Sequence, residues 1–409
     1  MNHKQIRQIL KDTDYIRTGG SAEELRAAEY LRDKCIALGA SAWLEEFDVD
    51  MAEMHSARLL ADGREVPCKG YLCCGSADID AELVYLPNTD PVSLRGVKDK
   101  IVLLDSGVGY FLFRDLLANG AAGFITYDGN VHYKDSDIDQ KELRGYVSCG
   151  EKLPGANINA KDAARLVKSG VKRVRLCVDQ REYPGKSRNV VAELPGRSDE
   201  WIILTAHYDS TSLSHGSYDN MSGCIGLLEI MDALRPTAPH RCGLRFVFCG
   251  SEERGLLGSK AYAAAHEQEL EKVVLNINLD MIGTYMGRFI ACCSTEEELV
   301  TYLKYLGAEL NWGIEARTGV YSSDSTPFAD KGVPAVSFAR IAPNNQATIH
   351  NRYDSMALLS DERLQSDGAF LTEFTRRMAD AAVCPVKRSI PEKVKGELDV
   401  YLNRKRKEN

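Results

Sequence analysis

The chain has 409 residues, of which 44% are hydrophobic and 27% are charged, values typical of a soluble globular protein. This length is too great for one ordinary core, so we expect two domains. A total of 51 Lys and Arg against 59 Asp and Glu gives a net charge of −8, which excludes nucleic acid as the main partner because phosphate binding needs a basic face.

The N-terminal residues Met1–Arg7 lack the apolar core of a signal peptide. No run of about 18 apolar residues occurs, so we expect no membrane span. These features predict a cytoplasmic protein, in which the twelve cysteines are free thiols. The absence of a CxxC pair argues against a zinc ribbon.

The first 50 residues open with helical patterning. Ser21 is placed to cap a helix, with Glu24 as its partner three residues on, and the apolar stripe that follows ends at Gly39. A strand is expected over residues 42–49. From about residue 52 short apolar runs dominate, and we interpret residues 52–185 as a separate, inserted α/β domain. Its expected strands are 82–86, 100–104, 123–127 and 171–178, with helices near 109–119 and 161–169.

Strands and helices alternate from about residue 187 onward. The expected strands are 188–193, 202–207, 244–249, 274–280, 287–293 and 334–340, and the expected helices are 221–234, 256–267, 296–311 and 362–382. This alternation predicts an α/β fold with a mixed, largely parallel central sheet flanked by helices. We assign residues 1–51 and 186–386 to this domain. The charged tail, residues 387–409, is expected to fray.

Residues that commonly bind metals stand at the ends of several of these strands. They are His207, Asp209, Asp219, Glu252, Glu253, Asp280 and, in a later polar loop, His350. Each has an ordinary explanation when taken alone, such as a helix N-cap for Asp219. Ligands of open α/β sheets bind at the carboxyl ends of the strands, however, so the fold could bring these segments together at one edge.

Two histidines and three carboxylates can give each of two zinc ions three protein ligands if one carboxylate bridges them. Such a pair lowers the pKa of a shared water, which becomes the nucleophile, and polarises the scissile carbonyl. A further carboxylate must move the proton, and one of the adjacent Glu252 and Glu253 is surplus to ligation. Asp209 could orient His207 through the second ring nitrogen.

These motifs, in this order, resemble the M28 family of co-catalytic zinc aminopeptidases. The matching runs are His207–Ser210, Asp219–Gly223, Ser251–Ser259, Asn278–Met281, Ser323-Asp324 and His350. The inserted domain resembles a protease-associated domain. The residues behind that resemblance are Val97–Leu103, Ala118–Gly123 and Leu153–Ile158.

The resemblance implies a role for each site residue. Asp219 would bridge the two zinc ions and precede a cis peptide bond. His207 and Asp280 would complete one metal site, and Glu253 and His350 the other. Glu252 would be the general base and acid, and Asp209 would orient His207. Tyr321 stands where some members use a tyrosine hydroxyl to bind the oxyanion.

The sequence therefore predicts a di-zinc metallo-aminopeptidase that acts on peptides. A carboxypeptidase or a glutaminyl cyclase on the same scaffold, and a non-catalytic receptor-like protein, are the alternatives. Ser325 follows Asp324 where many family members carry an aromatic residue or a histidine, so the preferred N-terminal residue is left open. The sequence also leaves open whether the chain forms a homo-oligomer.

Overall fold

Two long strands, β1 (Ser41–Ala61) and β8 (Arg173–Leu194), run from one unit of the chain into the other in the computed structural model. The first unit consists of Met1–Phe47 and Lys186–Asn409, and the second of Asp48–Gly185. The second unit is therefore an insertion in the chain of the first. The structure describes residues 1–105, 107–132, 137–343 and 346–407.

The first unit is built on a mixed sheet with the strand order β13-β12-β14-β11-β9-β10-β8. Neighbours among β14, β11, β9 and β10 are parallel, whereas β8 is antiparallel to β10 and β12 is antiparallel to β14. This arrangement confirms the predicted mixed, largely parallel sheet. The strands are β9 (Trp201–His207), β10 (Gly243–Cys249), β11 (Val273–Leu279), β12 (Arg288–Ser294), β13 (Glu315–Thr318) and β14 (Ala335–Ile341).

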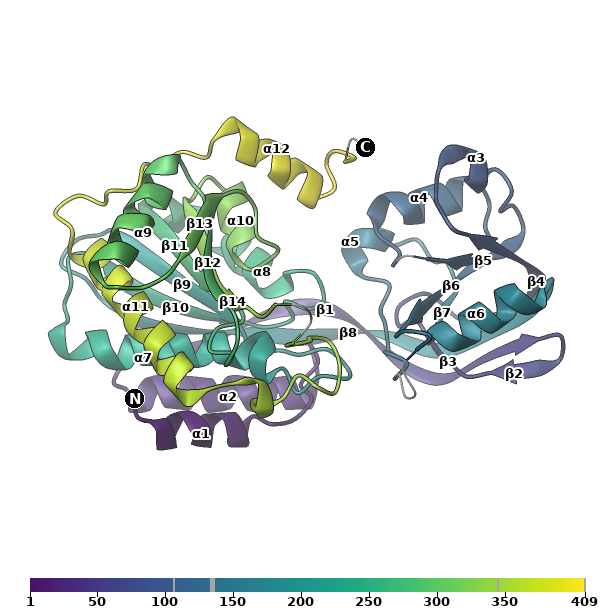
Figure 1. Cartoon of the computed structure of the whole chain (residues 1–409), viewed down its shortest axis with the longest axis horizontal. Helices are drawn as coiled ribbons and strands as arrows, with labels where there is room; N and C mark the ends of the chain where they lie inside the picture. The colour runs from purple at the N-terminus through teal and green to yellow at the C-terminus, as the bar shows by residue number, and fades with distance from the viewer. Residues whose placement is uncertain (106, 133–136, 344–345, 408–409) are drawn as a thin grey trace. The chain divides into compact units, whose positions relative to one another are not determined.

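Helices cover both faces of this sheet (Figure 1). In β10, Phe246 and Phe248 belong to the core on one face, and Val247 belongs to the core on the other. Burial on both faces explains why the parallel strands read as continuous apolar runs. The face of Phe246 is packed by α1 (His3–Asp12), α2 (Ala22–Ala37), α7 (Ser222–Leu234), α9 (Glu297–Glu309) and α11 (Asp361–Asp380). The opposite face is packed by α8 (Leu257–Ala265) and α10 (Ser325–Asp330).

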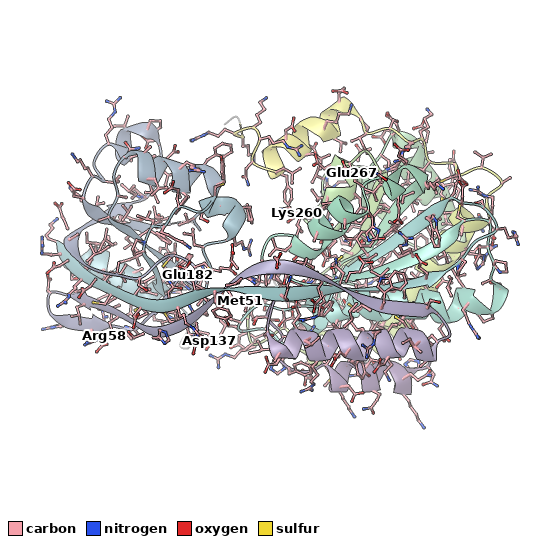
Figure 2. All side chains as sticks on the ribbon, turned by 180° about the vertical axis from the view of Figure 1, so that it is seen from behind. Met51, Arg58, Asp137, Glu182, Lys260 and Glu267 are labelled. Atoms are coloured by element: carbon pink, nitrogen blue, oxygen red, sulfur yellow. The ribbon has the colours of Figure 1, made fainter. Side chains whose placement is uncertain are left out.

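The second unit has its own sheet, with the order β8-β4-β5-β6-β7-β3, and its own core. Arg58 on β1 and Glu182 on β8 are labelled in Figure 2. Arg58 pairs with Glu65 at 3.3 Å, and Glu182 pairs with Lys152. The strands are β2 (Arg64–Val66), β3 (Cys68–Gly70), β4 (Ala77–Leu86), β5 (Lys100–Leu104), β6 (Gly123–Asp128) and β7 (Gly155–Asn159). The helices are α3 (Pro91–Leu94), α4 (Tyr110–Ala118), α5 (Gly145–Ser148) and α6 (Ala160–Ser169).

The charged tail contains a helix, α12 (Glu392–Tyr401), and the expectation that it frays is wrong. Ile390, Val394 and Leu398 are buried in a small core with Ala329 and Ala335. Residues four apart lie on one face of a helix, so Val394 and Leu398 give α12 an apolar stripe that the surrounding charges mask in the sequence. None of the helices in the described part of the chain has the length and apolar character needed to cross a membrane.

One buried carboxyl group lies on α7, away from the strand ends. The Glu229 side chain is 7% exposed, and its Oε2 atom makes no hydrogen bond. Burial raises the pKa of Glu229 to about 7. The unfolded chain keeps the ordinary, lower pKa, so between these two values the folded state holds a proton that the unfolded state has lost. Stability therefore falls as the pH rises through this window.

We predict that Glu229→Gln stabilises the protein at about pH 8 by roughly 1–3 kcal/mol, because the amide carries no charge to desolvate. The advantage should shrink as the pH falls through this window and level off below about 4.5, where the wild-type carboxyl is mostly protonated in both states. Melting temperatures measured across this range check the prediction, with the exposed Glu362→Gln on α11 as the control. A difference between Glu229→Gln and wild type that does not change with pH would contradict it.

Candidate functional site

The predicted site residues meet at the carboxyl ends of β9, β10 and β11. His207 is the last residue of β9, and Glu252 and Glu253 follow β10. Asp280 follows β11 directly. The strand ends are level, because His207 is in register with Cys249 of β10 and β11 runs parallel to β9. Asp219 comes from η1 (Ser217–Met221), a turn whose backbone is not helical at Asp219 and Asn220. His350 comes from the segment between β14 and α11.

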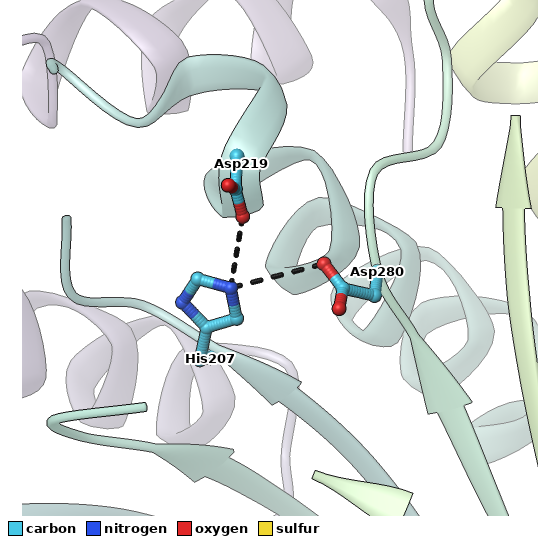
Figure 3. Close-up of side chains that lie close together, drawn as sticks. All are labelled: His207, Asp219 and Asp280. Carbon is cyan, nitrogen blue, oxygen red and sulfur yellow. Dashed lines mark hydrogen bonds and ion pairs between the residues drawn. The ribbon is translucent and has the colours of Figure 1, made fainter. Parts of the chain in front are cut away.

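One half of the cluster is centred on the His207 ring (Figure 3). The His207 Nε2 atom lies 3.0 Å from Oδ1 of Asp219 and 3.8 Å from Oδ1 of Asp280. The same nitrogen is 4.0 Å from Oε2 of Glu252. The His207 side chain is only 2% exposed, so these carboxylates face it in an environment of low dielectric constant.

The other half is centred on His350. Its Nε2 atom lies 3.2 Å from Oδ2 of Asp219 and 3.0 Å from Oε1 of Glu253. The His350 side chain is 45% exposed, so this half of the cluster is open to solvent. Asp219 contributes to both halves, with one oxygen directed at each histidine. The peptide bond between Asp219 and Asn220 is cis, as the family resemblance implied.

Burial and like charges set the protonation of this cluster. Burial raises the pKa of Glu253 and of Asp280, and the charge of Asp219 adds to the rise in both. Burial would raise the pKa of Asp219 too, but hydrogen bonds with His207 and His350 outweigh it and lower that pKa. Burial opposes the charged form of His350, yet the contacts with Asp219 and Glu253 raise its pKa to about 11. The carboxylates therefore favour positive charge between them.

The donor atoms are suited to metal ions. Oδ1 of Asp280 is buried and makes no hydrogen bond, and Oε1 of Glu253 is buried beside Nε2 of His350. Such buried oxygens are costly unless a cation satisfies them. Imidazole nitrogens and carboxylate oxygens are the ligands that zinc takes. Three groups have ligand atoms within 4.8 Å of one another: His207 with Asp219 and Asp280, Asp219 with Glu253 and His350, and His207 with Glu252 and Glu253.

Asp209 connects the two halves through the backbone. Its Oδ1 atom accepts a hydrogen bond from the Glu252 N–H at 2.9 Å, and Oδ2 accepts one from the Glu253 N–H at 3.2 Å. Oδ1 also lies 3.4 Å from Nδ1 of His207. The sequence predicted only the contact with His207. The structure shows that the same carboxylate also fixes the turn that carries the two glutamates.

Two buried charges that the sequence did not indicate come from the N-terminal segment. The Arg17 guanidinium donates hydrogen bonds to the carbonyl oxygens of Tyr208, His215 and Gly216, which lie in the loop between His207 and Asp219. The Glu24 carboxylate accepts a hydrogen bond from the Ser251 N–H at 2.9 Å, just before the paired glutamates. Burial, followed by the charge of Asp209, raises the pKa of Glu24 to about 7.

Ser21 does cap α2, accepting a hydrogen bond from the Glu24 N–H at 3.1 Å. The Glu24 carboxylate, in contrast, accepts from Gly20 N–H at 2.7 Å and reaches Ser251, rather than closing a box with Ser21. Local spacing assigns Glu24 to a helix cap, but its carboxylate instead binds the backbone just before Glu252 and Glu253. No short-range signal could have shown this, because Ser251 is far from Glu24 in the sequence.

Asp354 holds the backbone of Asp219. It accepts hydrogen bonds from the N–H groups of Tyr218 at 2.8 Å and Asp219 at 3.2 Å, and from the Ser214 hydroxyl at 3.0 Å. It follows His350 by four residues, so it ties the two segments together. The sequence placed Asp354 only in a polar loop.

Tyr321 lies in the loop between β13 and α10. Its side chain is half-buried, and its pKa is raised, first by burial and then by the charge of Asp280. The hydroxyl is therefore protonated and lies in the field of the cluster. Asp324, in the same loop, is buried beside the cluster, and burial raises its pKa to about 7.

The fold is shared with a zinc aminopeptidase of known structure. The zinc aminopeptidase BSAP from Bacillus subtilis superposes with a TM-score of 0.78 at 24% identity, over 96% of this chain and 98% of that chain. Residues 189–375 match the model of peptidase family M28. This segment of the chain is therefore similar to members of that family.

Relatives in sequence carry aminopeptidase names. Aminopeptidase YwaD of Bacillus subtilis (strain 168) is 33% identical over 189 residues, which cover 42% of this chain and 39% of that protein. Leucine aminopeptidase 2 of Trichophyton rubrum is 31% identical over 273 residues, which cover 63% of this chain and 52% of that protein. The chain thus spans about half or less of the length of these curated relatives. The matched family segment does not include the inserted unit, for which the protease-associated assignment stays a prediction.

We predict that Asp354→Asn weakens zinc binding about 10- to 100-fold, because the amide offers only one acceptor oxygen to the Tyr218 and Asp219 N–H groups and Asp219 is less well oriented. Competition with a chelator of known affinity measures the change. Asp199→Asn, whose carboxylate is 78% exposed, is the matched control. An unchanged dissociation constant in a folded Asp354→Asn variant would contradict the positioning role of Asp354.

Proposed function

We propose that the chain is a di-zinc aminopeptidase that removes N-terminal residues from peptides. The observation that carries the proposal is the position of Asp219, whose two oxygens face two different histidines. Each histidine also has a second carboxylate beside it, so the cluster divides into two ligand sets with one shared member. The aminopeptidase names of the relatives support the same activity.

His207, Asp219 and Asp280 would hold one zinc ion, and Asp219, Glu253 and His350 the other. Each set supplies three protein ligands and leaves room for water or substrate, as catalytic zinc sites require. Zinc bound there would supply Lewis acidity and would lower the pKa of a water at the site. Oδ1 of Asp280, which is buried without a hydrogen bond, and the contact of Oε1 of Glu253 with His350 support this division.

Glu252 is then left as the general base. It also lies near His207 and Glu253, but the two sets are complete without it. Its side chain is 13% exposed, compared with 8% for Glu253, so it has more access to a substrate. Burial, partly offset by His207 and reinforced by Glu253, raises the pKa of Glu252. A carboxylate with a raised pKa is a better proton acceptor, and it can return the proton to the leaving amine.

Asp209 and Tyr321 have supporting roles in this proposal. Asp209 orients His207 through the contact with Nδ1 and aims Glu252 through its backbone N–H. Tyr321 keeps its proton because its pKa is raised, so its hydroxyl can donate a hydrogen bond to the oxyanion that forms at the scissile carbonyl.

Of the three arginines near the site, Arg254, Arg340 and Arg352, the first two argue against a carboxypeptidase. A carboxypeptidase needs a cation for the free carboxylate of its substrate. The Arg340 guanidinium is buried and is bound to Asp367 and to the Gly287 carbonyl. Arg254 donates to the Gly19 carbonyl at 3.3 Å. These two guanidinium groups therefore already have acceptors within the protein.

We predict that Glu252→Gln lowers kcat about 10²- to 10⁴-fold, since the amide cannot accept the proton, while zinc content is unchanged. Glu253→Gln is the matched comparison, and it should reduce zinc content as well. Steady-state kinetics on aminoacyl p-nitroanilides and metal analysis measure both effects. Turnover that survives in Glu252→Gln would overturn the proposed base, and loss of zinc from Glu252→Gln would make it a ligand instead.

We also predict that peptides with a free N-terminus are cleaved and that their N-acetylated counterparts are not. A chelator should abolish the activity, and added zinc should restore it, because the buried carboxylates need the metal. Chromatography of paired free and blocked peptides checks the outcome. Cleavage of the blocked peptides at comparable rates would contradict the aminopeptidase assignment.

A further inference from the structure

Helix α12 lies beyond the segment that matches the family, yet it packs on the part of the fold that leads to Tyr321. Its buried residues Val394 and Leu398 contact the core that contains Ala329 of α10, and Val320 packs against the same core. The Arg404 guanidinium, just after α12, makes two hydrogen bonds of 2.6 Å to the carboxylate of Asp330, at the end of α10. These contacts fix the position of α12 on α10.

From this position α12 reaches the residue on each side of Tyr321. Oε2 of Glu397 accepts a hydrogen bond from the Val320 N–H at 3.1 Å. The Tyr401 hydroxyl lies 2.7 Å from the Ser322 hydroxyl. One helix therefore holds the backbone before Tyr321 and the side chain after it.

Tyr321 itself is held from the other direction by the start of α10. The Thr326 hydroxyl donates a hydrogen bond to the Tyr321 carbonyl at 3.0 Å. Residues 319–324 form neither helix nor strand, so their backbone is ordered by individual contacts. Besides those to α12 and α10, the Gly319 N–H donates to the Cys293 carbonyl at 3.0 Å. Gly319, which begins this loop, fits closely against α12, since a Cβ atom there would lie 3.1 Å from Oε2 of Glu397.

We propose that α12 is a positioning element for the Tyr321 hydroxyl and that Glu397 and Tyr401 are its positioning residues. The proposal rests on the aminopeptidase function and on the oxyanion role of Tyr321 proposed above. Neither Glu397 nor Tyr401 belongs to the ligand groups at the strand ends. They act on catalysis through the backbone and side chain that flank Tyr321. A donor misplaced by about 1 Å loses much of its effect on the transition state, so kcat is sensitive to such contacts.

The test combines Glu397→Ala with Tyr401→Phe, which removes both contacts and leaves the apolar face of α12 intact. We expect kcat for an aminoacyl p-nitroanilide to fall about tenfold with little change in KM, because the contact matters mainly in the transition state. Glu397→Gln keeps an oxygen acceptor for the Val320 N–H and should restore most of the loss. Glu392→Ala, on the same helix with a side chain that is 87% exposed, is the control.

A double-mutant cycle separates positioning from general destabilisation. In a Tyr321→Phe background the α12 substitutions should cause no further loss of kcat, because the hydroxyl that they position is already absent. Losses that add fully in that background would overturn the proposal, as would an unchanged kcat in the Glu397→Ala/Tyr401→Phe variant.

Hydrogen exchange of metal-free protein provides a readout that does not depend on activity. The Val320 amide and its neighbours in residues 319–324 should exchange at least about tenfold faster in Glu397→Ala/Tyr401→Phe than in wild type or Glu392→Ala. Unchanged exchange would overturn the role of α12. If wild-type protein does not cleave aminoacyl substrates, the proposed function fails, and the exchange measurement still decides whether α12 holds the loop.

Discussion

The repulsion among buried carboxylates at the carboxyl edge of the sheet is the constraint on which the rest of this structure depends. Asp219, Glu253 and Asp280 converge on two histidines, of which His207 is buried and His350 is partly open to solvent. Carboxylates so placed destabilise one another unless positive charge lies between them. The pKa values of Glu253, Asp280 and His350 are raised, which means that the cluster favours bound protons. Bound cations would supply the same positive charge in place of those protons.

Much of the surrounding fold acts to hold these repelling groups in place. Asp209 and Asp354 accept hydrogen bonds from backbone N–H groups of the ligand-bearing segments, and Arg17 binds the carbonyl oxygens of the loop that leads to Asp219. Each interaction acts on backbone rather than on a ligand side chain, so the carboxylate oxygens stay free for metal. The N-terminal segment thus takes part in the site, although none of the proposed ligands lies within it.

The sequence predicts the parts of this arrangement that depend on periodicity and on strand ends. His207 and Asp280 were predicted as site residues because apolar runs end at or beside them. The prediction that Glu252 is the general base and Glu253 a metal ligand came from the family resemblance. Arg17 and the support given by Asp354 were missed because hydrogen bonds between distant loops leave no periodic signal. Helix α12 was missed for a different reason. Its apolar stripe is surrounded in the sequence by charged residues, and its role is clear only from its packing against Ala329 and Ala335.

The central claim, that one carboxylate serves two metal sites, can be tested directly by anomalous diffraction at the zinc absorption edge from crystals of zinc-loaded protein. The account predicts two peaks separated by about 3.5–4 Å, as in other two-metal sites, with Asp219 between them. His207 and Asp280 should contact one peak, and Glu253 and His350 the other. A single peak, or a pair of peaks that does not share Asp219, would contradict the account.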